Sequence, residues 1–396
     1  MIDTREGEQS GQEGMDEFPG FAEGKHVIGT FAGQRRGPSL ICAAGIHGNE
    51  PAGVEALKRV LDTLQAHRQT FSGRLVALLG NTEAFSQGRR YVEKDLNRMW
   101  EKDRIAQLTA HKVEDLKHED LEQFELLQVL KSVTRGNPGD VFFMDLHTSS
   151  ADGPPFGVLN DSLHSRSFVR AFPLPLVLGF EEELRGTLAD YMDSLGHVSA
   201  GLEAGQHTSS LAVDHLESLI WIALVSAGNL SQEQVPEFQS HYQRLADCCR
   251  DLPSFIEVRY RHPVKREDEF LMQPGYRSFQ EVESGQLLAR DRQGDIAAPG
   301  RAFLLLPLYQ KEGEDGFFLA AAVRPFWIQL SAWIRPLRLD RLLHWLPGVQ
   351  KHPQEEGALL VHPGIARWYT LEFFHLLGFR RRPSKGARFV MVHRKG

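Results

Sequence analysis

The stretch SLICAAGIHGNEPAGVEALKRVLDTLQ, residues 39–65, has the pattern on which the prediction of the fold rests. It begins with an apolar run, Ser39–Gly45, that predicts a buried strand, and residues 51–65 have the apolar spacing of an amphipathic helix. Further strands are predicted at residues 74–80, 141–147, 176–180 and 198–204, and further helices at residues 104–133 and 210–226. Strands that alternate with helices are typical of an α/β domain with a central sheet.

The composition of the 396 residues is that of a soluble globular protein, with 41% hydrophobic and 24% charged residues. A net charge of −7 gives no reason to expect nucleic acid as a partner. The best apolar run, residues 219–228, is far shorter than the roughly 20 residues that span a bilayer, so no membrane partner is expected. Three cysteines are too few for a disulfide framework, which favours a reducing, cytoplasmic location.

Changes in composition divide the chain into four parts. Residues 1–24 are acidic and rich in glycine, which predicts a disordered tail, and the α/β domain follows over residues 25–252. Turn signals such as QPGY, ESGQ and RQGD then recur every 8 to 15 residues and predict a small β-rich domain over residues 253–326. The extension over residues 327–396 is basic, with 12 Lys and Arg against 4 Asp and Glu, and holds four of the six tryptophans. These tryptophans predict packing against the main body or a second subunit, which leaves a homo-oligomer open.

Metal-binding side chains follow two of the predicted strands. His47 and Glu50 lie in the loop after the first strand, and His147 ends the strand at residues 141–147, where α/β sheets bind their ligands. Two imidazoles and one carboxylate, with a fourth position open to water, are a ligand set of catalytic zinc sites. Asp145 lies on the same strand face and is placed to accept a hydrogen bond from a ligand imidazole. We expect one zinc ion per chain, although each segment alone also fits a loop or strand-end histidine without a metal.

Four more residues suit the chemistry of such a site. A water activated by zinc needs a proton acceptor, and Glu203 at the end of the strand at residues 198–204 is our candidate. Arg90 is a candidate for stabilising an oxyanion, and Asn97 with Arg98 suits the recognition of a substrate carboxylate. A salt-bridged glutamate and surface arginines are the alternative interpretations of these residues.

Four motifs together identify a family. The motifs GIHGNE, DLNR, DLHTSS and GLEAGQ, at residues 45–50, 95–98, 145–150 and 201–206, resemble those of the succinylglutamate desuccinylase/aspartoacylase family of the zinc carboxypeptidase superfamily. The resemblance covers roughly residues 25–325. It implies a central mixed sheet flanked by helices, followed by a small β-rich domain, with the basic extension outside it.

The resemblance also implies a role for each motif residue. The three metal-binding residues named above would hold zinc, and Glu203 would act as general base and then as general acid. Arg90 would lie by the oxyanion, and Asn97 with Arg98 would hold a carboxylate of the substrate. In one respect the chain departs from the family: residues 190–197, DYMDSLGH, lack the further substrate-binding arginine of aspartoacylase-like enzymes.

The leading hypothesis is a zinc-dependent hydrolase that cleaves the amide bond of an N-acyl amino acid or a related small amide that carries a carboxylate. A zinc carboxypeptidase or an esterase would use the same site. A catalytically silent binding or scaffold protein is the third hypothesis, and it predicts a damaged motif, whereas every motif residue is present.

Overall fold

The computed structural model describes residues 25–135, 139–159, 162–335, 343–352, 358–362, 377, 379–382 and 389–393. The tail predicted for residues 1–24 and much of the basic extension lie outside these residues.

An eleven-stranded mixed sheet runs through the described part of the chain, in the order β1-β3-β2-β4-β7-β5-β6-β8-β14-β13-β10. Its strands are β1 Val27–Ala32, β2 Arg35–Ala44, β3 Ser72–Leu79, β4 Val141–Ser149, β5 Phe156–Val158, β6 Leu176–Leu178, β7 Val198–Gln206, β8 Phe255–Pro263, β10 Gln280–Val282, β13 Ala302–Leu305 and β14 Asp315–Ala322. The four neighbours β3, β2, β4 and β7 are parallel, so their carboxyl ends lie at one edge of the sheet.

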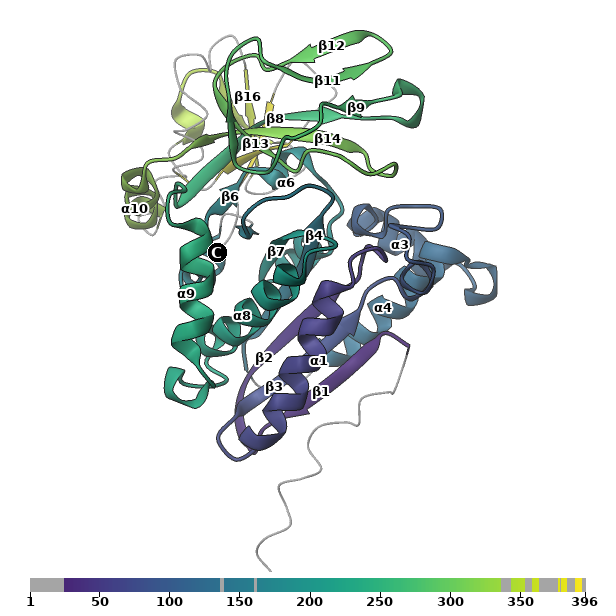
Figure 1. The fold of residues 1–396 in the computed structure, drawn as a ribbon, viewed down its shortest axis with the longest axis vertical. Coiled ribbons are helices and arrows are strands. Elements are labelled where there is room, and N and C mark those ends of the chain that lie inside the picture. Colours follow the sequence, from purple (N-terminus) through teal and green to yellow (C-terminus); the bar gives the residue numbers. More distant parts are fainter. Residues whose placement is uncertain are drawn as a thin grey trace, which may run out of the picture.

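Helices cover both faces of these parallel strands (Figure 1). On β2, Leu40, Cys42 and Ala44 belong to one hydrophobic core, whereas Ile41 and Ala43 belong to another, because successive side chains point to opposite faces. The first core also contains α1 Ala52–Leu64, α8 Ser210–Ala227 and α9 Phe238–Cys249. The second contains α3 Lys102–Ala110, α4 His118–Thr134 and α7 Leu188–Ser194. The expected α/β fold with a central mixed sheet flanked by helices is therefore confirmed.

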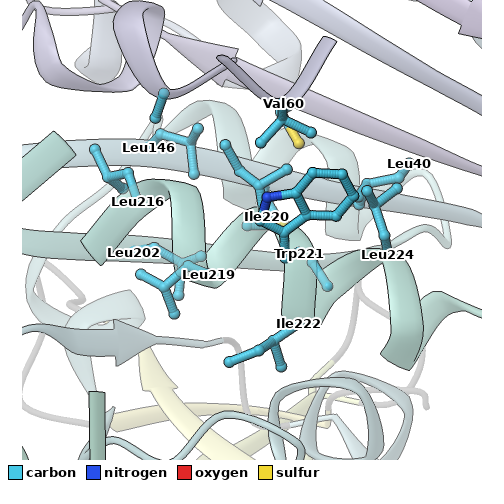
Figure 2. Close-up of a cluster of buried hydrophobic side chains, with 14 of the residues drawn as sticks. Leu40, Val60, Leu146, Leu202, Leu216, Leu219, Ile220, Trp221, Ile222 and Leu224 are labelled. Atoms are coloured by element: carbon cyan, nitrogen blue, oxygen red, sulfur yellow. The ribbon is translucent and has the colours of Figure 1, made fainter. Parts of the chain in front are cut away.

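Helix α8 is the centre of the first core (Figure 2). Its Trp221 is 1% exposed and belongs to the same cluster as Leu40 of β2, Leu146 of β4 and Leu202 of β7. By length and composition alone α8 could cross a membrane, but 61% of it is buried in the fold. Burial against the sheet accounts for its apolar composition.

One predicted helix is wrong in its extent. Residues 104–133 were expected to form a single helical pattern, but α3 ends at Ala110 and α4 begins at His118. His111 and Leu116 have extended backbone, with ψ of 156° and 139°. None of residues 111–118 is buried, so this polar stretch has no apolar face to stabilise a continuous helix.

The β-rich region continues the main sheet. The boundary predicted at residue 252 lies just before β8, which pairs in parallel with β6 and antiparallel with β14. A three-stranded sheet formed by β9 Leu271–Met272, β11 Leu287–Asp291 and β12 Gly294–Ala297 lies beside it at the top of Figure 1. Helices α2 Thr82–Gln87, α5 Leu163–Val169, α6 Phe180–Glu183 and α10 Pro325–Ile334 complete the α-helices of the described residues.

The described strands of the basic extension form a separate sheet. Its strands β15 Val349–Lys351, β16 Ala358–Val361, β17 Phe379–Arg382 and β18 Phe389–His393 are antiparallel in the order β15-β16-β18-β17. Helix α10 crosses the boundary predicted at residue 326, so the division into four parts stays a prediction.

Candidate active site

The expected metal ligands converge at the carboxyl ends of β2 and β4. His47 and Glu50 lie in the loop between β2 and α1, and His147 lies near the end of β4. His47 Nδ1 is 2.8 Å from Glu50 Oε1, and His147 Nδ1 is 3.1 Å from Glu50 Oε2. The three ligand atoms lie within 4.8 Å of one another, and all three residues are buried. Two imidazole nitrogens and a carboxylate at this spacing fit a divalent ion, and zinc accepts each of these ligand types.

Two glycines shape the loop that carries these ligands. Gly45 has a φ of +63°, a left-handed conformation that residues with a Cβ rarely adopt. A Cβ on Gly48 would lie 2.2 Å from the carbonyl carbon of Ala84 in α2. The chain therefore turns sharply after β2 and packs directly against α2, which positions His47 and Glu50 over the end of the sheet.

Each of the two histidines contacts the carboxylate of an aspartate through its Nε2 atom. His47 Nε2 donates to Asp95 Oδ1 at 3.1 Å, and His147 Nε2 is 3.0 Å from Asp145 Oδ2. Such contacts fix the tautomer and leave Nδ1 to face the metal position. Burial raises the pKa of Asp95, but the charges of Arg90 and His47 outweigh it and hold this pKa well below its ordinary value. Of these two carboxylates, Asp145 was predicted from the sequence and Asp95 was not, although Asp95 opens the DLNR motif.

Glu203 lies beside the metal ligands on β7. In the register of the sheet it is the partner of His147 on β4. Its Oε2 atom is buried and has no hydrogen-bond partner in the part of the chain that the structure describes. Burial raises the pKa of this carboxyl group to about 8, against the opposing charges of His147 and Arg90. In its ionised form this group can accept a proton from water in the pocket, because Oε2 has no protein partner there.

A buried carboxylate on α4 holds the loop over residues 88–98. Glu119 is 1% exposed, and its Oε1 accepts a hydrogen bond from Asn81 Nδ2 at 3.1 Å. It also accepts three backbone N–H groups, from Val92 at 2.6 Å, Glu93 at 3.0 Å and Lys94 at 3.1 Å. These four bonds satisfy both carboxylate oxygens and anchor the segment between Arg90 and Asp95 to the helix.

Arg90 points from this loop toward the metal ligands. Its Nη2 donates to Asp95 Oδ2 at 2.8 Å, and its Nη1 is 3.9 Å from Glu50 Oε1. Its Nε is buried without a hydrogen-bond partner among the described residues. An unpartnered N–H in this place can donate to an oxygen that gains negative charge during a reaction.

Asn97, which lies next to Arg98 in the sequence, connects two elements of the site through its side-chain amide. Its Nδ2 lies 3.2 Å from both Asp145 Oδ2 and His147 Nε2, and its Oδ1 accepts the backbone N–H of Leu188 at 2.8 Å. The amide group therefore links β4 to the start of α7. Its role in binding a substrate carboxylate stays a prediction.

Arg98 forms an ion pair with Asp315, a residue far along the chain. Its Nη1 donates to the carbonyl oxygen of Asn97 at 2.9 Å, and its Nη2 donates to Asp315 Oδ2 at 2.8 Å. Asp315 begins β14 of the β-rich region. No local pattern in the sequence indicates this pair, because 217 residues separate its members.

One pocket is lined by all eight of the predicted site residues. The lining also includes the polar residues Thr148, His207 and Gln310. His207 Nε2 is 3.3 Å from Gln310 Oε1, and His207 Nδ1 is 2.7 Å from the Thr148 hydroxyl. Gln310 Oε1 also accepts a hydrogen bond from Asn49 Nδ2 at 2.9 Å, which ties the β13–β14 hairpin to the loop of the metal ligands.

Comparisons with known proteins agree with the motifs. A model described as the succinylglutamate desuccinylase/aspartoacylase catalytic domain matches residues 36–219. A succinylglutamate desuccinylase from Serratia proteamaculans is 30% identical over 156 residues, which are 38% of this chain and 44% of that protein. One from Pseudomonas paraeruginosa is 39% identical over 80 residues, which are 20% of this chain and 24% of that protein. The matches therefore span less than half the length of these relatives.

A solved structure has the same fold. The succinylglutamate desuccinylase/aspartoacylase from Rhodobacter sphaeroides superposes with a TM-score of 0.54 and 16% identity, over 74% of this chain and 88% of that chain. At this identity the likeness supports the fold alone.

Proposed function

This chain belongs to the succinylglutamate desuccinylase/aspartoacylase family, and from this premise we propose that it hydrolyses the amide bond of an N-acyl amino acid or a related small amide with a carboxylate. The observation that carries the proposal is the convergence of His47, Glu50 and His147 beside the unpartnered carboxylate of Glu203. A metal-binding cluster and a proton acceptor at one edge of a parallel sheet are the parts that hydrolysis by activated water requires.

The metal in this proposal is zinc, one ion per chain, held by His47 Nδ1, His147 Nδ1 and the Glu50 carboxylate. When bound, it would supply Lewis-acid polarisation of the acyl carbonyl and of a water molecule. Asp95 and Asp145 keep a proton on the outer nitrogen of each histidine, so that the inner nitrogen presents its lone pair to the metal.

The other residues of the pocket handle protons and charge. Glu203 takes a proton from the attacking water at Oε2 and passes it to the amine that leaves. Arg90 donates its free Nε–H to the carbonyl oxygen as negative charge develops there. Arg98 binds the substrate carboxylate and thereby orients the amide.

The remaining expectations from the sequence are part of the same proposal. A small molecule is the expected partner, without nucleic acid or membrane, and a homo-oligomer stays open. The free thiols of Cys42, Cys248 and Cys249 agree with the proposed cytoplasmic location.

Metal content and one variant test the proposal. Protein purified without added metal should contain about one zinc per chain by elemental analysis, and His147→Ala should lose it. Glu203→Gln should keep the metal and lose turnover by about 10²–10⁴-fold, because general base catalysis contributes this much. An active Glu203→Gln variant would refute the role of this residue, and a chain that takes up no zinc on dialysis would refute the hydrolase.

Substrate panels separate the alternatives on the same site. Purified holoenzyme is assayed on N-acyl amino acids, on peptides with a free carboxyl terminus and on the matching esters. Preference for peptides would indicate a carboxypeptidase, and preference for esters an esterase. A zinc-loaded chain that cleaves none of the three classes would favour the binding or scaffold protein.

A further inference from the structure

The charges around Arg98 bear on which substrates the pocket accepts. Asp315 receives Arg98 Nη2 on one carboxylate oxygen at 2.8 Å and Arg261 Nε on the other at 2.5 Å. Arg261 lies on β8 and also donates to the carbonyl oxygen of Glu183 at 3.1 Å. The side chains of Arg98 and Asp315 are only 18% and 14% exposed, so water screens their interaction weakly. The guanidinium proposed to bind substrate therefore already has a carboxylate of the protein as its partner.

The lining of the pocket offers little other positive charge. Among the described lining residues the arginines are Arg90 and Arg98, and Arg90 is paired with Asp95 at 2.8 Å. Acidic residues outside the metal site, Asp190, Glu314 and Asp315, line the same pocket. A substrate carboxylate on Arg98 would lie close to Asp315, and a second carboxylate would find no further arginine in the lining.

Part of the pocket is apolar. Its wall includes Val158, Leu159, Phe180 and Leu184 of the α/β region and Leu306 and Leu308 of the β13–β14 hairpin. Leu159 and Phe180 are 2% and 4% exposed. A charged group placed against such a wall would lose its hydration without gaining a partner, whereas an apolar group would be stabilised there.

We infer that the substrate is an N-acyl amino acid with a single carboxylate and an uncharged, apolar acyl group or side chain, and that Asp315 is a specificity-determining residue that disfavours a second carboxylate. This inference rests on the proposed function. Asp315 acts through Arg98: it shares the guanidinium charge, so one substrate carboxylate is still bound but an N-acyl dicarboxylate is repelled. Discrimination by a repelling charge is a common means of specificity.

Steady-state kinetics of the zinc-loaded full chain test the inference. The probes are N-acetyl-L-leucine, N-acetyl-L-aspartate and N-succinyl-L-glutamate. We expect kcat/KM for N-acetyl-L-leucine to exceed that for both dicarboxylates by at least about 10-fold. A wild-type preference for a dicarboxylate would overturn the inference and leave the proposed function standing. Failure to cleave any N-acyl amino acid would overturn the proposed function itself, and this inference with it.

The variant Asp315→Asn separates specificity from a merely structural role. It should lower KM for N-acetyl-L-aspartate and reduce the ratio of kcat/KM for N-acetyl-L-leucine to kcat/KM for N-acetyl-L-aspartate by about 10-fold. The variant Asp315→Glu, which keeps the negative charge, should restore this ratio. If Asp315 had a structural role only, kcat/KM for both substrates would change by the same factor, and that outcome would overturn the assignment of Asp315. The matched control is Asp295→Asn, because Asp295 pairs with Arg290 at 2.7 Å on the surface of the same region, with both side chains 60% exposed. If Asp315→Asn does not fold, the wild-type preference still decides on the substrate class.

Discussion

The α/β region and the β-rich region contribute to one pocket in different ways. The α/β region supplies the candidate metal ligands and Glu203 from the carboxyl ends of β2, β4 and β7, where the backbone hydrogen bonds of parallel strands determine the spacing. The β-rich region supplies Gln310 and Asp315 from the β13–β14 hairpin and the start of β14. The difference indicates that the chemistry depends on the first region, and that the second region contributes to substrate recognition together with Arg98 of the first. Substitutions of the metal ligands or of Glu203 should lower turnover on every substrate, and substitutions in the second region should change KM.

The largest effect is expected for Glu203 in the metal-free protein. Burial raises its pKa from 4.5 to about 8, so the folded state keeps a proton that the unfolded chain releases above pH 4.5. The stabilisation is complete below pH 4.5 and is lost as the pH rises to 8, at about 1.4 kcal/mol per pH unit, or up to about 5 kcal/mol in total.

Urea unfolding in the presence of a chelator measures this loss. The stability of wild type should fall relative to that of Glu203→Gln between pH 5 and pH 8, because glutamine cannot ionise. Parallel stability profiles of the two proteins would show that the environment of Glu203 does not favour the protonated form.

The second-largest effect, on zinc affinity, is expected for Asp95, whose carboxylate contacts His47 Nε2. Asp95→Asn should weaken zinc binding by about 10–100-fold, because carboxylates that orient a ligand histidine contribute this much to metal affinity. Competition with a chromophoric chelator measures the affinity. Asp120→Asn is the matched control, since Asp120 pairs with Lys94 at 2.7 Å near the same loop, and its ion-pair partners among the described residues are Lys94 and Arg104. Equal zinc affinities of the two variants would show that the Asp95 contact does not tune the site.

A smaller effect is expected for Glu119, which anchors the loop of Arg90. Glu119→Gln replaces one acceptor oxygen with a donor that faces backbone N–H groups, which should cost about 1–3 kcal/mol of stability. The value of kcat should fall on every substrate, because the loop holds both Arg90 and Asp95. The control on the same helix is Glu125→Gln, whose carboxylate contacts Lys25 and His26 rather than the loop of Arg90. If KM changed selectively in Glu119→Gln, the loop would belong to recognition rather than to chemistry.

Much of the fold and the centre of the site could be predicted, because their signals are local. Apolar runs such as 39–45 and 141–147 predict buried strands, and the polar residues that follow them meet where parallel strands end. The residues that position the ligands carry weaker signals. Asp95 lies in a recognised motif, but its partner His47 is 48 residues away, and the four donors to Glu119 come from two loops.

The contacts of Asp315 and Gln310 could not be predicted for the same reason. They depend on the pairing of β8 with β14, which joins segments more than 50 residues apart. The break at residues 111–117 was missed because a polar stretch continues the helical composition without an apolar face to bury.

The smallest effect is expected for Gln310, which connects the two regions. Gln310→Ala removes the acceptor for Asn49 Nδ2 and the partner of His207 Nε2. One or two hydrogen bonds of this kind contribute about 1 kcal/mol, so KM should rise by about 3–10-fold while kcat changes by less than about 2-fold. The control Gln286→Ala removes a hydrogen bond to Tyr276 in the same region but away from the pocket, and should leave KM unchanged. If kcat fell in Gln310→Ala and KM did not rise, the hairpin would take part in the chemistry. The assignment of the β-rich region to substrate recognition would then be wrong.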